Sequence, residues 1–170
     1  MFLGLDLSTQ KLKAALVDDD LKLKEEFAVT FDTDLPRYGT RNGVYIDELV
    51  ITSPVEMWVE ALDVLLKQMQ QAEIPFEQIR GISGSGQQHG SVYWSYEAES
   101  LLSGLDCNHS LRDQLCPAAF AFDRSPNWQD SSTGEECRMF EQAAGGEEQL
   151  AQISGSKAHH VCASHECVRS

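Results

Sequence analysis

The chain has 170 residues, of which 42% are hydrophobic, and 27 acidic against 13 basic side chains give it a formal net charge of −14. This length suits one domain with a sizeable core. Because so acidic a surface repels phosphate backbones and anionic lipid, the composition predicts neither a nucleic-acid nor a membrane partner.

The N-terminus and the cysteines indicate the compartment. The first residues run directly into a strand-like segment, without the basic and apolar regions of a secretory signal. No apolar run reaches the roughly 18 residues of a membrane span. The five cysteines are irregularly spaced, which favours a reducing compartment over a disulfide framework. The sequence therefore predicts a cytoplasmic protein.

The first 31 residues predict three short strands. Residues 2–7 and 12–17 are apolar and flank a polar turn at 8–11, and a second turn at 18–20 precedes a strand over 21–31 with apolar residues at period two. Short turns between successive strands predict an antiparallel meander.

A long loop and a helix are expected next. Residues 32–52, which contain a proline and two glycines, predict the loop. The sequence Ser53-Pro54-Val55-Glu56 has the form of a capping box with proline at the first helical position. The helix should end before Pro75 and present one apolar face, formed by Trp58, Leu62, Leu65, Leu66 and Met69.

The second half of the chain predicts fewer elements. Residues 80–83 and 91–96 predict two strands around a glycine-rich loop, and residues 97–122 show no clear pattern. Residues 132–135 predict the start of a helix that the glycines at 145–146 end. A strand meander followed by helix, strand and helix predicts an α/β layered domain.

The glycine-rich loop, "GISGSGQQHG" at 81–90, does not match a nucleotide motif. His89 stands where a dinucleotide fingerprint needs its third glycine, and no Lys-Ser or Lys-Thr pair completes a Walker loop. The amides of Gln87 and Gln88 and the imidazole of His89 suit a hydroxyl-rich ligand. A turn with no binding role is the alternative.

The N-terminal stretch "FLGLDLSTQKLKA" carries the second candidate motif. Asp6 lies at the end of an apolar strand, and the turn after it carries Ser8 and Thr9, whose amides and hydroxyls can approach phosphate. Lys11 or Lys13 can supply positive charge, and Asp6 can hold a hydrated Mg²⁺. An ordinary hairpin with solvated side chains is the alternative.

Several segments resemble known proteins in order and spacing. "GLDLSTQKLK" resembles the first phosphate motif of the actin and sugar-kinase superfamily, and "GISGSGQQHGS" resembles the sugar-contacting segment of xylulokinases in the FGGY carbohydrate kinase family. "DLPRYGT", "TSPVEMWVEALD", "PNWQDSST" and "GSKA" are similar to the animal-type xylulokinases.

This resemblance implies a truncated ribonuclease-H-like α/β domain and ATP-dependent phosphorylation of D-xylulose to xylulose 5-phosphate. It implies that Gln88 and His89 contact the sugar, that Asp130 borders the sugar cleft, and that the Mg–ATP phosphates are bound by a further set: Asp6, Ser8, Thr9 and Lys13. With Mg²⁺ and ATP as cofactors, Asp6 would hold the metal through water.

The resemblance also implies missing parts. It covers an incomplete N-terminal kinase domain at 1–158, and the general base and a second domain are expected beyond it. Residues 159–170, "HHVCASHECVRS", form a divergent tail whose histidines and cysteines have zinc-ligand chemistry but no recognised spacing. Three interpretations stay open: a xylulokinase fragment, a kinase of another ketose or polyol, and a non-catalytic sugar-binding fragment. Ending inside the fold should expose apolar surface near Trp128 and Phe140, where a partner could bind.

Overall fold

The computed structural model describes residues 1–159 and has an α/β architecture. Its elements in chain order are as follows: β1 (Phe2–Leu7), β2 (Lys11–Val17), β3 (Leu23–Thr30), α1 (Phe31–Asp34), η1 (Pro36–Tyr38), β4 (Tyr45–Asp47), β5 (Val50–Pro54), α2 (Val55–Gln71), η2 (Phe76–Gln78), β6 (Gly81–Ser85), α3 (Ala98–Ser103), α4 (Leu111–Leu115), β7 (Arg124–Pro126), α5 (Gly134–Ala143) and α6 (Glu147–Ser154).

The main sheet has the strand order β3-β2-β1-β6. The predicted meander is confirmed, because β1 pairs antiparallel with β2 and β2 pairs antiparallel with β3. The strand after α2, β6, runs parallel to β1, with Asp6 opposite Ser85 at the end of the ladder. Parallel pairing brings the carboxyl ends of β1 and β6 to the same edge of the sheet, where the polar residues of the two candidate motifs lie.

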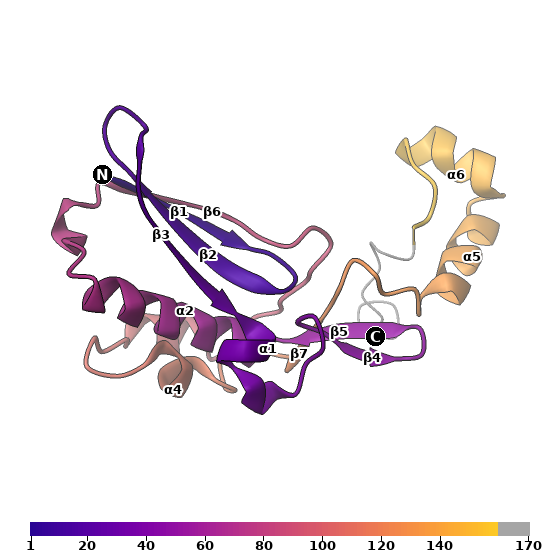
Figure 1. Ribbon diagram of the computed structural model, residues 1–170. Helices are drawn as coiled ribbons and strands as arrows, with labels where there is room; N and C mark the ends of the chain where they lie inside the picture. The colour runs from indigo at the N-terminus through magenta and orange to yellow at the C-terminus, as the bar shows by residue number, and fades with distance from the viewer. Residues whose placement is uncertain (160–170) are drawn as a thin grey trace.

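The helix α2 covers one face of this sheet (Figure 1). Its apolar face is confirmed around Trp58, Leu65 and Met69, which are buried against sheet residues such as Leu16 and Val29. On its other side α2 carries Asp63, whose two carboxylate oxygens accept the backbone N–H groups of residues 111 and 112 at 2.8 and 2.9 Å. This contact attaches α4 to α2 as a further layer.

The predicted capping box is wrong. Ser53 belongs to β5, Pro54 is the N-cap residue, and no side chain caps the start of α2. The Ser53 hydroxyl donates instead to the carbonyl of Gly43 at 2.9 Å and is fully buried. The local pattern fits a cap, but the long-range pairing of β5 with β7 takes the residue into a strand.

Two further expectations are wrong. Residues 32–52 contain α1, η1, β4 and most of β5 rather than one long loop, and β4-β5-β7 form a second sheet. Residues 91–96 form no strand, since only Trp94 pairs there, in an isolated bridge to Phe120. Their aromatic residues instead pack in pairs, with Trp94 stacked on Phe120 at a ring-centroid distance of 5.1 Å.

The last helices lie beyond the second sheet (Figure 1). The helix predicted from residues 132–146 is confirmed as α5, and a helix that the sequence did not predict, α6, follows the glycine pair. Neither contains a buried residue. The expected exposure of Trp128 and Phe140 is confirmed, at 49% and 62%.

Candidate functional site

The two candidate motifs meet in one pocket of about 520 Å³ at the carboxyl ends of β1 and β6. Its lining comprises the end of β1, the turn after it, the loop after β6 and one tryptophan: Asp6, Leu7, Ser8, Thr9, Gly86, Gln87, Gln88, His89 and Trp128. Segments about 80 residues apart in the chain therefore share one concave surface. A pocket with convergent polar groups is the expected form of a small-molecule site.

Asp6 is the acidic group of this pocket. Its Oδ2 accepts the Ser8 hydroxyl at 2.9 Å, and its Oδ1 accepts the Ser85 hydroxyl at 3.3 Å. Both partners are neutral donors, so they hold the carboxylate in place and leave its charge uncompensated. Such a group can attract a cation.

Lys13 lies beside Asp6 but outside this pocket. It is the register partner of Asp6 in the β1–β2 ladder, and it lines a neighbouring shallow cavity with Asp6 and Glu26. The structure thus brings Asp6, Ser8 and Thr9 together with the glycine-rich loop at 86–89 and leaves Lys13 at the border of the pocket.

Contacts on several sides hold the turn after β1. The Gln87 side-chain amide donates to the Ser8 carbonyl at 3.3 Å, and the Trp128 indole N–H donates to the Thr9 hydroxyl at 3.3 Å. The Phe31 amide donates to the carbonyl of residue 10 at 3.0 Å. The contacts with Gln87 and Trp128 fix the turn relative to the glycine-rich loop at 86–89.

Gly43 supports the same turn from behind. Its φ is +78°, and a Cβ added there would lie 2.0 Å from the Thr9 carbonyl oxygen, so only glycine allows this approach. Asp32 shapes the Gly43 segment by accepting the Thr40 hydroxyl at 2.8 Å and the Gly43 amide at 3.0 Å on Oδ1. The Asn42 amide adds a bond of 2.6 Å to Oδ2.

These bonds also determine how Asp32 titrates. Burial raises the pKa of its carboxyl, but the hydrogen bonds from Thr40, Gly43 and Asn42 together outweigh that effect and lower the pKa below its ordinary value of 3.8. Asp32 therefore stays ionised at neutral pH and keeps the Gly43 segment against the turn.

Gln88 and His89 are exposed at the mouth of the pocket. His89 has a φ of +63°, in the left-handed region that residues other than glycine rarely adopt. Backbone conformations of this kind are concentrated at ligand-binding positions. The loop therefore presents its imidazole from an uncommon backbone conformation.

Asp130 lies outside the pocket lining. It is 5% exposed, its Oδ2 accepts the Ile51 amide at 2.8 Å, and its Oδ1 accepts the Ser132 amide and hydroxyl at 3.1 and 2.7 Å. In this structure it joins the segment after β7 to β5. Its role in bordering a sugar stays a prediction.

The sequence predicts Gln87 as a possible ligand contact beside Gln88 and His89, but it predicts neither the structural bonds of Gln87 nor the residue Asn127. Asn127, which is 1% exposed, holds Gln87 by donating to its side-chain oxygen at 3.1 Å. The pairing with a residue 40 positions away has no local signature.

The residues present fit a metal ion that is bound mainly through water. Among residues 1–159, no cluster of three or more histidine, cysteine or acidic side chains could enclose a metal. Mg²⁺ typically keeps several waters and takes one or two carboxylates together with substrate phosphates. The single Asp6 carboxylate beside two hydroxyls suits that mode. Of the zinc-type residues of the tail, all but His159 lie outside the described residues.

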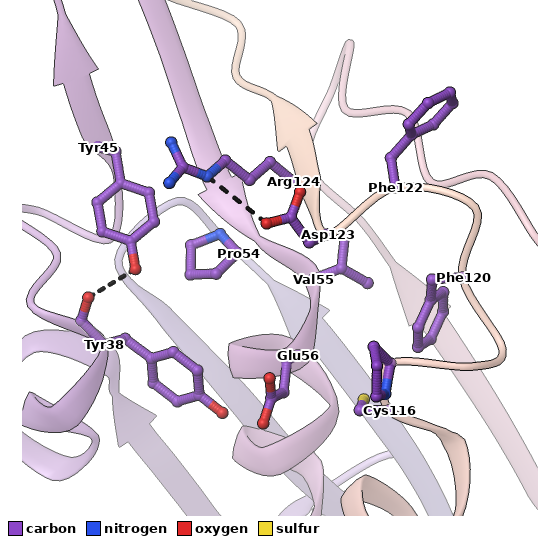
Figure 2. Close-up of a pocket in the computed structure, with 11 residues that line it drawn as sticks. Tyr38, Tyr45, Pro54, Val55, Glu56, Cys116, Phe120, Phe122, Asp123 and Arg124 are labelled. Atoms are coloured by element: carbon purple, nitrogen blue, oxygen red, sulfur yellow. Dashed lines mark hydrogen bonds and ion pairs between the residues drawn. The ribbon is translucent and has the colours of Figure 1, made fainter.

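A second cavity of about 210 Å³ lies between α2, α4 and the second sheet, and Figure 2 shows the residues that line it: Tyr38, Tyr45, Pro54, Val55, Glu56, Cys116, Pro117, Phe120, Phe122, Asp123 and Arg124. The Tyr45 hydroxyl donates to the Tyr38 carbonyl at 2.6 Å, and burial raises the pKa of the Cys116 thiol to about 11. None of the predicted site residues lines this cavity.

Comparisons with known proteins place the chain in a family. Residues 1–105 match the N-terminal domain of the FGGY family of carbohydrate kinases. The chain is 48% identical to xylulose kinase of Saccharomyces cerevisiae over 160 residues, which are 93% of this chain and 27% of that protein. It is 46% identical to xylulose kinase 2 of Arabidopsis thaliana over 162 residues, 94% of this chain and 29% of that protein.

The fold agrees with solved structures. A kinase from Brucella ovis, described as a xyloylose kinase, superimposes with a TM-score of 0.66 over 94% of this chain and 26% of its own, at 18% identity. The predicted α/β fold of a sugar kinase is thereby confirmed. No helix within residues 1–159 is long and apolar enough to cross a membrane. The chain belongs to the FGGY family of carbohydrate kinases and spans little more than a quarter of the length of these curated relatives.

Proposed function

We propose that residues 1–158 are the N-terminal domain of a cytoplasmic kinase that transfers phosphate from ATP to D-xylulose, forming xylulose 5-phosphate. The observation that carries the proposal is the pocket in which the turn at 6–9 and the loop at 86–89 face each other. The names of the relatives suggest the substrate. Because the chain spans 27% and 29% of the length of these relatives, we assign the complete activity to a longer protein.

Gln88 and His89 supply the sugar side of the pocket. An amide and an imidazole both donate and accept hydrogen bonds, which suits the hydroxyl groups of a ketopentose. The half-exposed Trp128 forms one wall and presents an apolar ring surface beside these polar groups. Asp130 supports the sugar side through the segment that it shares with Trp128.

Asp6, Ser8 and Thr9 supply the phosphate side, with Lys13 at its border. The turn offers backbone amides and hydroxyls to phosphate oxygens. Asp6 would hold Mg²⁺ through water, and the ion would neutralise charge on the ATP phosphates. Orienting a hydroxyl next to a neutralised phosphate is most of what phosphoryl transfer requires of a protein.

Residues 1–170 alone should bind the sugar without phosphorylating it. Almost three quarters of the length of the yeast relative has no counterpart in this chain, and no residue here is assigned as general base. Loss of a general base typically costs about 10²–10⁴-fold in rate, and loss of the opposing surface also removes the proximity effect. A non-catalytic sugar-binding role is therefore the second candidate for the 170-residue chain, in which residues 159–170 are a divergent tail.

A chimera tests the proposal. It joins residues 1–158 to the part of the yeast relative that follows its matched segment, and it is assayed beside residues 1–170 with ATP, Mg²⁺ and a panel of ketoses and polyols. We expect the chimera, but not the 170-residue chain, to phosphorylate D-xylulose in preference to ribulose and glycerol. Phosphorylation of xylulose by residues 1–170 at an enzyme-like rate would contradict the proposal that this chain lacks the complete activity.

Asp6→Asn separates the effect of the Asp6 charge on metal binding from the effect of the side chain's size and shape. The amide keeps the size and one acceptor oxygen, but it removes the charge that attracts the metal. In the chimera kcat should fall by about 10²-fold or more, since metal-assisted charge neutralisation contributes several kcal/mol. The exposed Asp47, on β4, is the control position, and Asp47→Asn should leave kcat unchanged.

A further inference from the structure

A chain of hydrogen bonds connects the segment after β7 with the turn after β1. The Asn127 side-chain amide donates to the Gln87 side-chain oxygen at 3.1 Å, and the Gln87 side-chain amide donates to the Ser8 carbonyl at 3.3 Å. Gln87 thus uses both ends of its side chain, one toward Asn127 and the other toward the turn. It is also the immediate neighbour of Gln88 and His89.

Asn127 is a fixed anchor for this chain of bonds. It is 1% exposed, its backbone N–H donates to the Ile51 carbonyl at 2.8 Å, and its carbonyl accepts the Asp130 amide at 2.9 Å. Its side-chain oxygen accepts the Gln129 amide at 3.0 Å. With these groups bonded, Asn127 has little freedom to change rotamer, so it transmits the position of the second sheet to Gln87.

The bond at the other end orients a peptide plane. The Ser8 carbonyl and the Thr9 N–H belong to one planar trans peptide and point in opposite directions. Holding the Ser8 oxygen on Gln87 therefore fixes the direction of the Thr9 N–H, a backbone donor of the turn that lines the pocket. Amides of such turns bind phosphate oxygens only when their direction is set in advance.

We infer that Gln87 and Asn127 are positioning residues that set the Ser8–Thr9 peptide for phosphate binding. The loop that carries the proposed sugar ligands and the turn that carries the proposed phosphate ligands then move as one unit. This inference rests on the proposed function, and it assigns the two glutamines different tasks. Gln88 acts on the sugar directly, whereas Gln87 acts on ATP through the turn.

Three variants separate these tasks in the chimera. Gln87→Met keeps the length of the side chain and removes both hydrogen bonds. Gln87→Glu keeps the oxygen that accepts from Asn127 and replaces the donor to Ser8 with a repelling oxygen. Gln88→Met makes the matched change at the neighbouring position.

The variants are compared by their KM for Mg–ATP and their KM for xylulose. Loss of one hydrogen bond corresponds to a change of about 3- to 10-fold in a binding constant. Both Gln87 variants should therefore raise the KM for Mg–ATP by about that factor and change the KM for xylulose less than twofold. Gln88→Met should do the reverse. Equal effects of Gln87→Met on both constants, or no effect on that for Mg–ATP, would overturn the inference.

A double-mutant cycle tests the role of Asn127. If it acts through Gln87, Asn127→Ala combined with Gln87→Met should be no worse for the Mg–ATP constant than the single change with the larger effect. If the two changes multiply their effects on the KM for Mg–ATP, Asn127 acts independently of Gln87, and its inferred positioning role would be overturned. Thermal melts of the variants identify a loss of fold.

An amide spectrum of ¹⁵N-labelled residues 1–170 distinguishes failure of this inference from failure of the proposed function. If the wild-type chimera phosphorylates no sugar, the proposed function fails, whereas the positioning of the turn is still decided by the Thr9 amide resonance. That resonance should shift in Gln87→Met and stay in place in Gln88→Met. An unmoved Thr9 resonance in Gln87→Met would overturn the positioning role.

Discussion

The sheet with α2 and the pair α5–α6 are built from similar amphipathic segments, yet they differ in what covers them. Phe31, Met57 and Leu65 have no exposed surface, whereas α5 and α6 have no buried residue. Met139 and Phe140 of α5 are both 62% exposed. Amphipathic pattern alone therefore does not determine burial, because a helix also needs an opposing surface.

The difference also locates the site. The family match, residues 1–105, contains the main sheet, α2 and both motifs of the pocket. Only Trp128 of the pocket lining comes from outside that range, and it lies before α5. The proposed site therefore lies with the sheet and α2, whereas α5 and α6 expose apolar side chains that the rest of residues 1–159 does not cover.

The largest expected effect sharpens the contrast in stability. Phe31→Ala should lower the free energy of unfolding by about 3–5 kcal/mol, since it empties a fully buried position. Phe140→Ala removes the same atoms from an exposed position on α5 and should change stability by less than about 0.5 kcal/mol. Urea unfolding of residues 1–170 measures both. Similar losses would mean that α5 is packed in solution, contrary to the comparison.

A glycine pair tests whether packing holds the turn of the site. Gly43→Ala should destabilise the protein by more than the roughly 1–2 kcal/mol that a left-handed backbone costs, because the added Cβ would meet the Thr9 carbonyl oxygen at 2.0 Å. Gly39 has a φ of +63° and no heavy atom within 4 Å of an added Cβ, so Gly39→Ala should show the backbone cost alone. Equal melting temperatures for the two variants would show that the packing of Gly43 against Thr9 does not hold the turn.

Elements whose evidence is local could be predicted from the sequence. The alternating apolar residues of β1 and β2 and the helical spacing in α2 act within a few residues of one another. The second sheet could not be predicted, because β5 pairs with β7 some 70 residues later and both are very short. Ser53 illustrates the error, since its local capping pattern is overridden by that distant pairing.

The site shows the same limit. Asp6, Ser8 and Thr9 follow an apolar strand, and Gln88 and His89 lie in a glycine-rich loop, so each group has a local signal. Their convergence depends on parallel pairing of β1 with β6, which no local pattern shows. The hydrogen bond from Asn127 to Gln87 and the close approach of Gly43 to Thr9 each join residues more than 30 positions apart in the chain.

Dye binding would test whether the apolar side chains of α5 and α6 are exposed in solution. Residues 1–170 should bind a hydrophobic fluorescent dye, because α5 and α6 expose Met139, Phe140 and Ile153. Replacing Met139 and Phe140 by glutamate should reduce the fluorescence severalfold with little change in melting temperature. Replacing Leu21, an exposed apolar residue of the β2–β3 turn, is the control. A sharp melt with no dye signal in the wild type would contradict an uncovered α5–α6 surface.

The smallest expected effect concerns pH and lies within the sheet-and-α2 region. The folded-state pKa of Asp32 is lowered by the hydrogen bonds that outweigh its burial, and it lies below the ordinary value of 3.8. A lowered folded-state pKa adds stability above the unfolded-state pKa, and that stability disappears as the pH falls through the folded-state value. Asp32→Asn should therefore be less stable than wild type at about pH 6, and the gap should close as the pH falls below about 4. Urea midpoints across this range measure the gap, and midpoints that stay equally far apart at every pH would show that the charge of Asp32 does not hold the Gly43 segment.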